Sequence, residues 1–360
     1  MKSNVYFVEL SSDEPASTIN EKLRALFLEA GLNGCVDNHD VVAVKVHFGE
    51  KGNETFIKPS MIRPVVDEIK LCGGIPFLTD TNTLYRGQRD NAISHIKLAH
   101  EHGFTLENVG APVIIADGLL GRNEVEVEIN GKYHDTVSIA EEAATANAAI
   151  IISHATGHIA CGYGGTIKNI GMGFSSRMGK LMQHSKTLPE IVKQRCNSCG
   201  VCIKWCPEEA ILMEDDGAFI VSLECIHCGE CLAVCRQEAV RFSWNRSSED
   251  LQMRIAEHAY GVIKNKPGKV GYITFLISIT KDCDCLNRKM TPILADIGVL
   301  AGKDPVAVDA AVLDLTKQNG GKDLASLSYP GIKPDVQLEH GEMIGMGTRS
   351  YNLIKLNGKF

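Results

Sequence analysis

Eight of the thirteen cysteines in this chain lie between Cys196 and Cys235, where they form two similar runs. The first run reads CNSCGVCIKWCPEEAI, and the second, which begins at Cys225, reads CIHCGECLAVCRQEAV. Every cysteine of one run matches a cysteine of the other at an offset of 29 residues, as do a glycine and a Glu-Ala pair. Disulfides are rare in cytosolic proteins, so a thiol repeat of this kind indicates metal or redox chemistry.

The spacing in both runs is C-x₂-C-x₂-C-x₃-C, which is the ligand pattern of bacterial proteins that hold two 4Fe–4S clusters. Three closely spaced thiolates surround one cubane, and the fourth thiolate of each run binds the other cluster. The spacing therefore predicts one cluster on Cys196, Cys199, Cys202 and Cys235, and a second cluster on Cys225, Cys228, Cys231 and Cys206. Two neighbouring clusters would relay single electrons.

Two zinc sites built from the same thiols are the alternative, because zinc also binds four cysteines. Zinc would not require two matching runs of four cysteines with a shared Glu-Ala tail, so we favour clusters. Arg236 follows the second run where Pro207 follows the first, and this change removes no ligand.

Another cysteine pair, Cys283 and Cys285, lies in KDCDCLNRK, after the apolar run GYITFLISIT. These thiols could bind a metal together with Asp or His, exchange with disulfides and persulfides, or pack as small apolar side chains. The neighbouring Asp282 and Asp284 would raise a thiol pKa by repulsion between like charges. We therefore favour a possible additional metal site, or chemistry close to a cluster, over sulfur chemistry.

Polar residues follow several predicted strands, in KVHFGEKGNET, LTDTNTLYRGQRDN, SHATGHIACGYGGTIKNIGMG and KDCDC. Ligands of α/β sheets bind beyond the carboxyl ends of the strands, although polar loops are common there in any case. The candidate catalytic residues are His47, Asp80, His154, Lys168, Cys283 and Cys285. The glycines before Lys168 could turn backbone amides toward an anion, but a tight structural turn is the favoured interpretation.

The elements that must position these residues alternate between strand and helix. The hydrophobic patterns predict strands at 4–10, 40–49, 75–80, 112–118 and 148–155, helices at 18–31, 59–74, 89–103 and 138–147, and a hairpin with an Asn-Gly turn at 124–139. After the repeat they predict helices at 247–264 and 304–320, strands at 270–280 and 292–302, and an edge strand at the end. This alternation predicts an α/β layered domain with a mostly parallel sheet.

The domain prediction follows from where the alternation is interrupted. We expect a host α/β domain made of residues 1–187 and 245–360, with a small α+β ferredoxin-like domain inserted at 188–244. Three consecutive domains are the alternative, but the last segment has too few predicted strands to form a sheet of its own.

Composition excludes several classes of function. The net charge of −7 gives no basic surface for nucleic acid, and no apolar run approaches the length that crosses a bilayer. The start of the chain, MKSNVYFVELSSDEP, lacks the apolar region of a signal peptide. The expected location is therefore cytoplasmic, without a membrane or nucleic-acid partner.

The motifs quoted above resemble domain-of-unknown-function family 362, and within it the members with an inserted 4Fe–4S ferredoxin domain. The resemblance rests on KVHFGEKGN, PFLTDTNTLYRGQR, APVIIADGLLG, SHATGH, GYGGTIKNIGMGFSSRMGK, the two cysteine runs, CDC and DIGVLAGKDPVAVDAA, which occur in the family's order from Val44 to Ala311. It implies cluster binding by the eight cysteines of the repeat and assigns no reaction.

The functional expectation is an iron–sulfur protein with two 4Fe–4S clusters that relay electrons to an unassigned redox site in the host domain, as in an oxidoreductase. Its partner would be a redox protein or a small-molecule electron donor or acceptor. The alternatives are a non-catalytic electron-transfer protein that docks a redox partner, and an iron–sulfur sensor.

Overall fold

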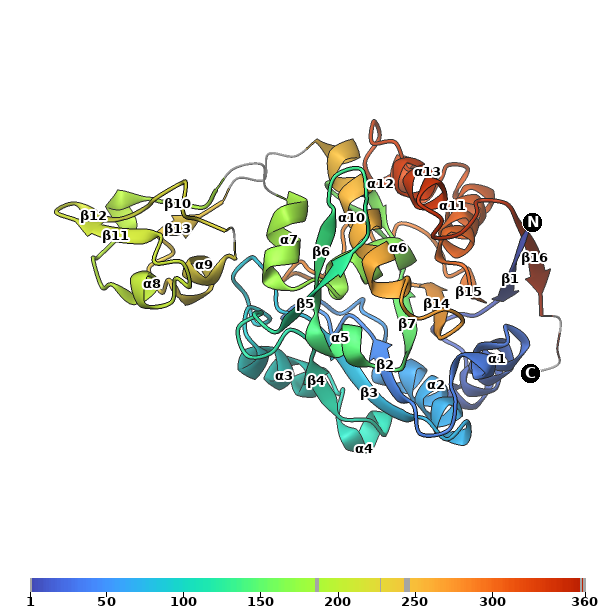
Figure 1. Cartoon of the computed structure of the whole chain (residues 1–360). Coiled ribbons are helices and arrows are strands. Elements are labelled where there is room, and N and C mark those ends of the chain that lie inside the picture. Colours follow the sequence, from blue (N-terminus) through green and yellow to red (C-terminus); the bar gives the residue numbers. More distant parts are fainter. Residues whose placement is uncertain (1, 185–187, 227, 243–246, 357, 359–360) are drawn as a thin grey trace.

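A computed structural model describes residues 2–184, 188–226, 228–242, 247–356 and 358. Its centre is an eight-stranded sheet, shown in Figure 1. The strand order is β16 (Tyr351–Lys355), β1 (Ser3–Val8), β15 (Gly298–Gly302), β14 (Val270–Leu276), β7 (Ala148–His154), β2 (Val41–Lys45), β3 (Ile75–Asp80) and β4 (Val113–Ile115).

The strand directions confirm the predicted α/β class and its mostly parallel sheet. Strand β15 pairs antiparallel with both β1 and β14, whereas all other neighbours in this sheet pair parallel. Strands from both sides of the cysteine repeat join the same sheet. The carboxyl ends of β2, β3, β7 and β14 therefore meet at one edge, which is the edge where the predicted polar stretches begin.

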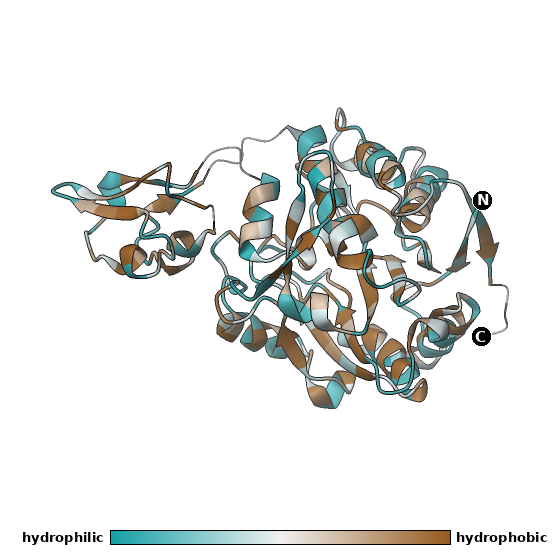
Figure 2. Ribbon diagram, viewed as in Figure 1, coloured by the Kyte–Doolittle hydropathy of each residue, from teal (hydrophilic) through white to brown (hydrophobic). Residues whose placement is uncertain are grey.

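Two helical layers cover the sheet, because its central strands are apolar on both faces. Along β7, Ile150 and Ile152 face one core, while Ala149 and Ile151 face the other. The first core includes α1 (Ala16–Glu29), α2 (Pro59–Leu71), α3 (Ala92–Glu101) and α4 (Leu106–Val109). The second includes α6 (Thr166–Gly173), α10 (Ser248–Ile263), α11 (Pro305–Gly320), α12 (Leu324–Ser328) and α13 (Val336–Met343). Figure 2 shows the hydrophobic colouring concentrated on the central strands and on the inner sides of these helices.

Helix signals in the sequence place several boundaries well. The Asp304 side chain accepts hydrogen bonds from the backbone N–H groups of Val306 and Ala307 at the start of α11. Ser247 caps α10 in the same way, through the N–H of Asp250. Both caps match the residues that the sequence marks as helix starts.

The predicted hairpin forms between β5 (Glu124–Glu128) and β6 (Thr136–Ala140), but its turn differs from the expected one. Asn130 has a positive φ of 49°, and Gly131 has none, so the two residues do not form a type I′ turn. The chain instead reverses beyond Gly131, whose N–H bonds the carbonyl of His134. Helix α5 (Glu141–Thr145) follows, shorter than predicted because β6 continues to Ala140.

Two short elements after β7 carry residues of the later site. A small hairpin, β8 (Thr156–His158) with β9 (Gly162–Gly164), leads into α6, and α7 (Arg177–His184) follows. The sequence analysis assigns no helix or strand to these residues. The described helices include none that is both long enough and apolar enough to cross a membrane.

Residues 188–226 and 228–242 form a small lobe, at the left of Figure 1. Its elements are β10 (Glu190–Ile191), the short helix η2 (Lys193–Arg195), α8 (Val201–Lys204), β11 (Ile211–Glu214), β12 (Gly217–Ile220), α9 (Glu230–Val234) and β13 (Val240–Arg241). A separate cluster of buried residues, Ile211, Ala218, Cys231 and Val240, holds these elements together. The predicted boundaries after residues 187 and 244 lie at positions outside the described residues, and the domain division stays a prediction.

Candidate active site

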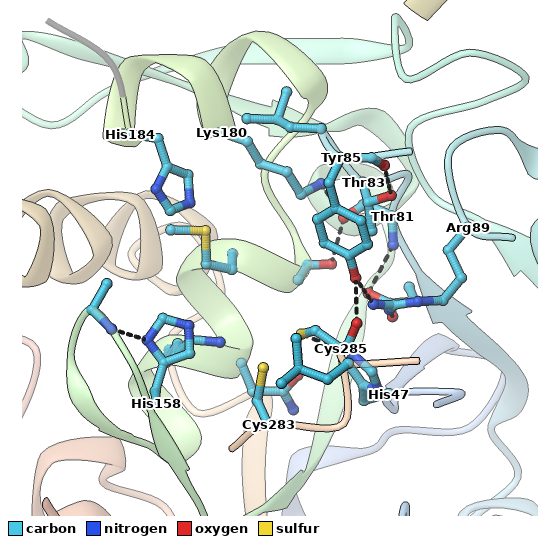
Figure 3. Close-up of a pocket in the computed structure, with 18 of the residues that line it drawn as sticks. His47, Thr81, Thr83, Tyr85, Arg89, His158, Lys180, His184, Cys283 and Cys285 are labelled. Carbon is cyan, nitrogen blue, oxygen red and sulfur yellow. Dashed lines mark hydrogen bonds and ion pairs between the residues drawn. The ribbon is translucent and has the colours of Figure 1, made fainter. Parts of the chain in front are cut away.

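A cavity of about 410 Å³ lies at the carboxyl edge of the sheet, within the size range of small-molecule sites. Five of the six predicted candidates line it, namely His47, Asp80, Lys168, Cys283 and Cys285. They come from the ends of β2 and β3, from α6 and from the loop after β14. Figure 3 shows the two cysteines at the floor of the cavity, with Lys180 and His184 of α7 above them. The structure thus brings together residues that are far apart in the chain.

Cys285 is the more acidic thiol of its pair. Its Sγ lies 3.5 Å from Nε2 of His47, and Nδ1 of the same ring accepts the N–H of Gly49 at 3.0 Å. The ring proton therefore sits on Nε2 and faces the sulfur. The hydrogen bond with Cys283 lowers the pKa of Cys285 well below its ordinary value, and the His47 ring acts in the same direction.

Cys283 shows the opposite behaviour. Its hydrogen bond with Cys285, together with burial, raises the pKa of the Cys283 thiol well above the ordinary value. Cys285 is therefore the thiol of the pair that ionises more readily. Thiolates are the reactive form of cysteine in both nucleophilic and redox chemistry.

The two acids beside these cysteines do not act as the sequence suggests. Asp284 Oδ2 lies 2.8 Å from Nδ1 of His154, and its Oδ1 accepts a hydrogen bond from Thr55. Asp282 pairs with Arg288 at 2.6 Å and accepts a hydrogen bond from Tyr329. Asp284 still repels a negative charge on Cys285, but Cys283, His47 and Lys168 outweigh this repulsion, so the net direction for Cys285 is opposite to the expectation.

His154 is the one predicted candidate that does not line the cavity. Burial opposes a charge on this ring, but the carboxylate of Asp284 raises the pKa of His154 above its usual value. Its Nε2 bonds the carbonyl oxygen of Ile277 at 2.8 Å. His154, at the end of β7, therefore holds the cysteine loop in place from outside the cavity, as a positioning residue.

Asp80 stands at the centre of a buried ion network. Its Oδ1 lies 3.2 Å from Nζ of Lys45, and its Oδ2 lies 3.2 Å from Nη1 of Arg89. Burial works to raise the pKa of Asp80, but the charge of Lys45 and its other neighbours lowers it well below the usual range. Arg89 also contacts Glu50 and donates to the hydroxyl of Tyr85. Asp80 is thus a carboxylate at neutral pH and serves as a counter-charge.

Two lysines of the cavity differ in their partners. Lys180 donates to Oγ1 of Thr81 at 2.6 Å and to the carbonyl of Ser175 at 2.7 Å, and burial lowers its pKa to about 8. Lys168 has no hydrogen-bond or ion-pair partner among the residues described. Burial opposes its charge, yet the interaction with the cysteine pair raises the pKa of Lys168. Its ammonium is therefore the counter-charge of the cysteine pair.

The glycine-rich stretch before Lys168 is a structural turn, as favoured. The backbone N–H groups of Thr166 and Ile167, at the start of α6, donate to the carboxylate of Asp309 at 2.7 and 2.9 Å. These amides are therefore not available to an external anion. Asp309 is only 1% exposed, and burial raises its pKa to about 6.

The cysteines of the repeat surround two separate small cavities in the lobe. Cys196, Cys199, Cys202 and Cys235 line one, and Cys206, Cys225, Cys228 and Cys231 line the other. No group of three or more His, Cys, Asp or Glu side chains in the described residues is arranged to hold a single metal ion.

The internal repeat is also visible in the backbone of the lobe. Gly200 and Gly229 occupy equivalent positions with left-handed φ angles of 70° and 75°. The N–H groups of Ala210 and Ala239 donate to Sγ of Cys206 and of Cys235, at 3.2 and 3.3 Å. The two halves therefore fold alike around the fourth cysteine of each run.

A family model described as "Domain of unknown function (DUF362)" matches residues 42–314. The chain belongs to this family. The match confirms the resemblance that the motifs indicate, at the level of the family. No curated protein matches the chain.

Two solved structures are similar to this DUF362 chain. One is the lactate racemase apoprotein from Thermoanaerobacterium thermosaccharolyticum, at 11% identity and a TM-score of 0.38, covering 77% of this chain and 51% of that one. The other is a protein from Thermotoga maritima, at 12% identity and a TM-score of 0.38, covering 80% of this chain and 56% of that one. The DUF362 chain thus spans little more than half the length of these proteins.

In this DUF362 member, the loop of the second cysteine run packs against α7. A Cβ atom added to Gly229 would lie 2.6 Å from Cδ1 of Leu181, and Glu230 pairs with Arg122 of the host at 3.1 Å. Lys180 and His184, on the same helix, line the cavity. Helix α7 therefore lies between the second set of four cysteines and the cysteine pair of the host.

Sequence reasoning missed several residues of the DUF362 site. Lys45 closes the apolar run VVAVK, which reads as an ordinary strand end, and Tyr85 lies in a loop with no periodic pattern. The Tyr85 hydroxyl faces the carbonyl of Cys285 at 3.4 Å and so supports the cysteine loop. The one available signal for these residues was their place just after, or at, the carboxyl end of a strand.

Proposed function

We propose that the protein binds two 4Fe–4S clusters through the eight cysteines of the lobe and passes single electrons to a redox site in the host cavity. The observation that carries this proposal is the grouping of the repeat into two sets of four thiols, each around its own cavity. The two sets are those expected when the fourth cysteine of each run binds the opposite cluster.

The surroundings of these sulfurs support the same proposal. Backbone N–H groups point at Cys196, Cys206 and Cys235, and hydrogen bonds to sulfur are one means by which proteins set cluster potentials. The glycines in left-handed conformation allow the chain to bend tightly round each set. When bound, the clusters would supply one-electron reduction, and this chain would supply the ligands and these N–H donors.

The host cavity is suited to receive electrons from the lobe. The loop of the second run contacts one side of α7, and residues of α7 line the cavity. One helix with its side chains is about 10 Å across, so the separation is short on the scale of the domain. The cavity contains a pair of cysteines one residue apart, and such a pair is a redox-competent group.

Metal analysis after anaerobic reconstitution tests the proposal. We expect about eight irons and eight sulfides per chain, with an EPR signal on reduction. The variant Cys228→Ser should lose cluster content, whereas Cys72→Ser, which changes a cysteine outside the repeat, should keep it. Zinc in place of iron, without visible absorbance, would contradict the proposal, because zinc sites are colourless and need only one ion for four thiolates.

A non-catalytic electron-transfer protein is the second candidate, and the surface of the lobe favours it. Leu223, Ile226 and Trp205 are exposed apolar side chains, and the last two directly follow or precede proposed cluster ligands. Exposed apolar residues near a redox centre are suited to docking a redox partner protein. In that case Cys283→Ser and Lys168→Ala would leave electron transfer to the partner unchanged.

A further inference from the structure

We propose that Cys283 and Cys285 form a dithiol–disulfide pair that cleaves the sulfur–sulfur bond of a small organic disulfide. This inference rests on the proposed function, because the clusters supply the electrons that restore the pair. It differs from the metal interpretation of this CDC motif, for which the described residues provide no grouped third ligand.

The geometry presents the Cys285 sulfur as a nucleophile. Both cysteines line the 410 Å³ cavity, and the N–H of His47 faces Cys285 Sγ. The cysteine loop is held rigidly, because Asp284 bonds His154 through its carboxylate and accepts the N–H of Glu50 through its carbonyl at 2.9 Å. A fixed thiolate beside a hydrogen-bond donor is the arrangement that thiol–disulfide exchange requires.

The cavity walls indicate the class of substrate. Leu84, Met172 and Leu286 provide apolar surface, which suits the carbon skeleton of an organic disulfide. Lys168 lines the same cavity as the two sulfurs, and its charge can stabilise the thiolates that form during cleavage. The volume admits a small molecule and leaves no room for a folded protein.

The chemical steps balance as follows. The Cys285 thiolate attacks one sulfur of the substrate, the substrate S–S bond breaks, and one substrate thiolate leaves. That thiolate takes the proton of Cys283, whose sulfur then attacks Cys285 Sγ and releases the second substrate thiolate. The product is a Cys283–Cys285 disulfide. Two electrons, one from each reduced cluster, and one proton regenerate the Cys283 thiol and the Cys285 thiolate.

The route of these electrons explains why the lobe contacts α7. Two one-electron carriers match the two electrons that a disulfide accepts, and the second cysteine run lies directly against the helix that borders the cavity. The final acceptor would be the small disulfide, and the original donor would be a low-potential one-electron reductant.

An anaerobic mixing experiment tests the inference. Protein with clusters reduced by dithionite, then freed of excess reductant, is mixed with 2-hydroxyethyl disulfide, and cluster reoxidation is followed by visible absorbance. We expect rapid reoxidation with two thiols released per disulfide. Cys285→Ser should slow it about a hundredfold or more, since the nucleophile is lost, while Cys72→Ser should behave as wild type. Equal rates in Cys285→Ser and wild type would overturn the inference.

A trapping measurement separates this inference from the function on which it rests. In Cys283→Ser, the substrate should remain attached to Cys285 as a mixed disulfide, visible as a mass increase on that peptide with or without clusters. Attachment to other cysteines instead, or reaction only with a protein disulfide such as that of insulin, would refute it. If the reconstituted protein bound no iron but still formed this adduct, the result would contradict the proposed function and leave the cleavage of disulfides supported.

Discussion

Replacing Lys168 by methionine is the sharpest electrostatic test of the site. Lys168 lines the same cavity as Cys283 and Cys285 and has no hydrogen-bond or ion-pair partner in the described chain. The other cations of the cavity have partners of their own, because Asp80 engages both Lys45 and Arg89. The substitution keeps an unbranched side chain of similar length and removes its ammonium group.

The expected magnitude follows from the pKa of Cys285. A nearby opposite charge typically shifts a pKa by about 1–3 units, and each unit changes the thiolate fraction about tenfold below the midpoint. The thiolate of Cys285 exists above its lowered pKa and is lost as the pH falls through it. We therefore expect Lys168→Met to move the midpoint upward by about one unit, and to slow alkylation about tenfold at pH values below both midpoints.

The assay is the rate of carbamidomethylation of each cysteine against pH, measured anaerobically by peptide mass spectrometry. Cys161 provides an internal reference, because burial raises its pKa to about 12 and keeps it unreactive. Lys97→Met, a change at an exposed lysine on α3, is the matched control. An unchanged midpoint in Lys168→Met, or faster alkylation of Cys283 than of Cys285, would refute the reasoning.

Three further predictions concern stability and the contact between lobe and host. Asp309 has a folded pKa of about 6, above its unfolded value, so its ionisation destabilises the fold as the pH rises. The free energy of unfolding of Asp309→Asn, measured with denaturant, should therefore rise by about 2–3 kcal/mol relative to that of wild type between pH 4 and pH 7. A difference between the two proteins that does not change with pH would contradict this. Glu257 is fully buried, its pKa is lowered to about 2, and it bonds His134 and backbone amides. Glu257→Gln should therefore lower the free energy of unfolding by about 2–4 kcal/mol at pH 7, and by less as the pH falls toward 2. Gly229→Ala should slow electron transfer from the clusters to the cysteine pair, because the new Cβ would clash with Leu181. Gly200→Ala is the matched control: the position has a similar left-handed φ, but a Cβ there meets nothing within 4 Å, so electron transfer should keep its rate. Equal rates in the two glycine variants would show that the contact with α7 is not on the electron route.

Local signals in the sequence account for most of the fold. The continuous apolar run in AAIIISH predicts a strand buried on both faces, and Asp304 before Pro305 predicts the start of α11. Helix α7 was not predicted, because RMGKLMQH contains a glycine and few apolar residues. Its burial comes from contacts with other parts of the chain, which no local pattern contains.

The candidate site was predicted in outline and not in its electrostatics. Strand ends identify His47, Asp80 and the cysteine pair, since parallel strands bring their carboxyl ends together. The sequence neighbours of Cys285 suggest that acids raise its pKa. The actual partners are distant, because His154 neutralises Asp284 from 130 positions away in the chain. Charge balance in a folded site therefore depends on long-range pairs that adjacency does not reveal.

A reductive titration under anaerobic conditions tests the central claim most directly. Fully oxidised protein with its disulfide formed should take up four electrons per chain, one for each cluster and two for the Cys283–Cys285 disulfide. The double variant Cys283→Ser with Cys285→Ser should take up two and keep its visible absorbance. Two outcomes would contradict a two-cluster relay that serves this cysteine pair. One is that both proteins take up the same number of electrons, and the other is that the visible absorbance does not bleach during reduction.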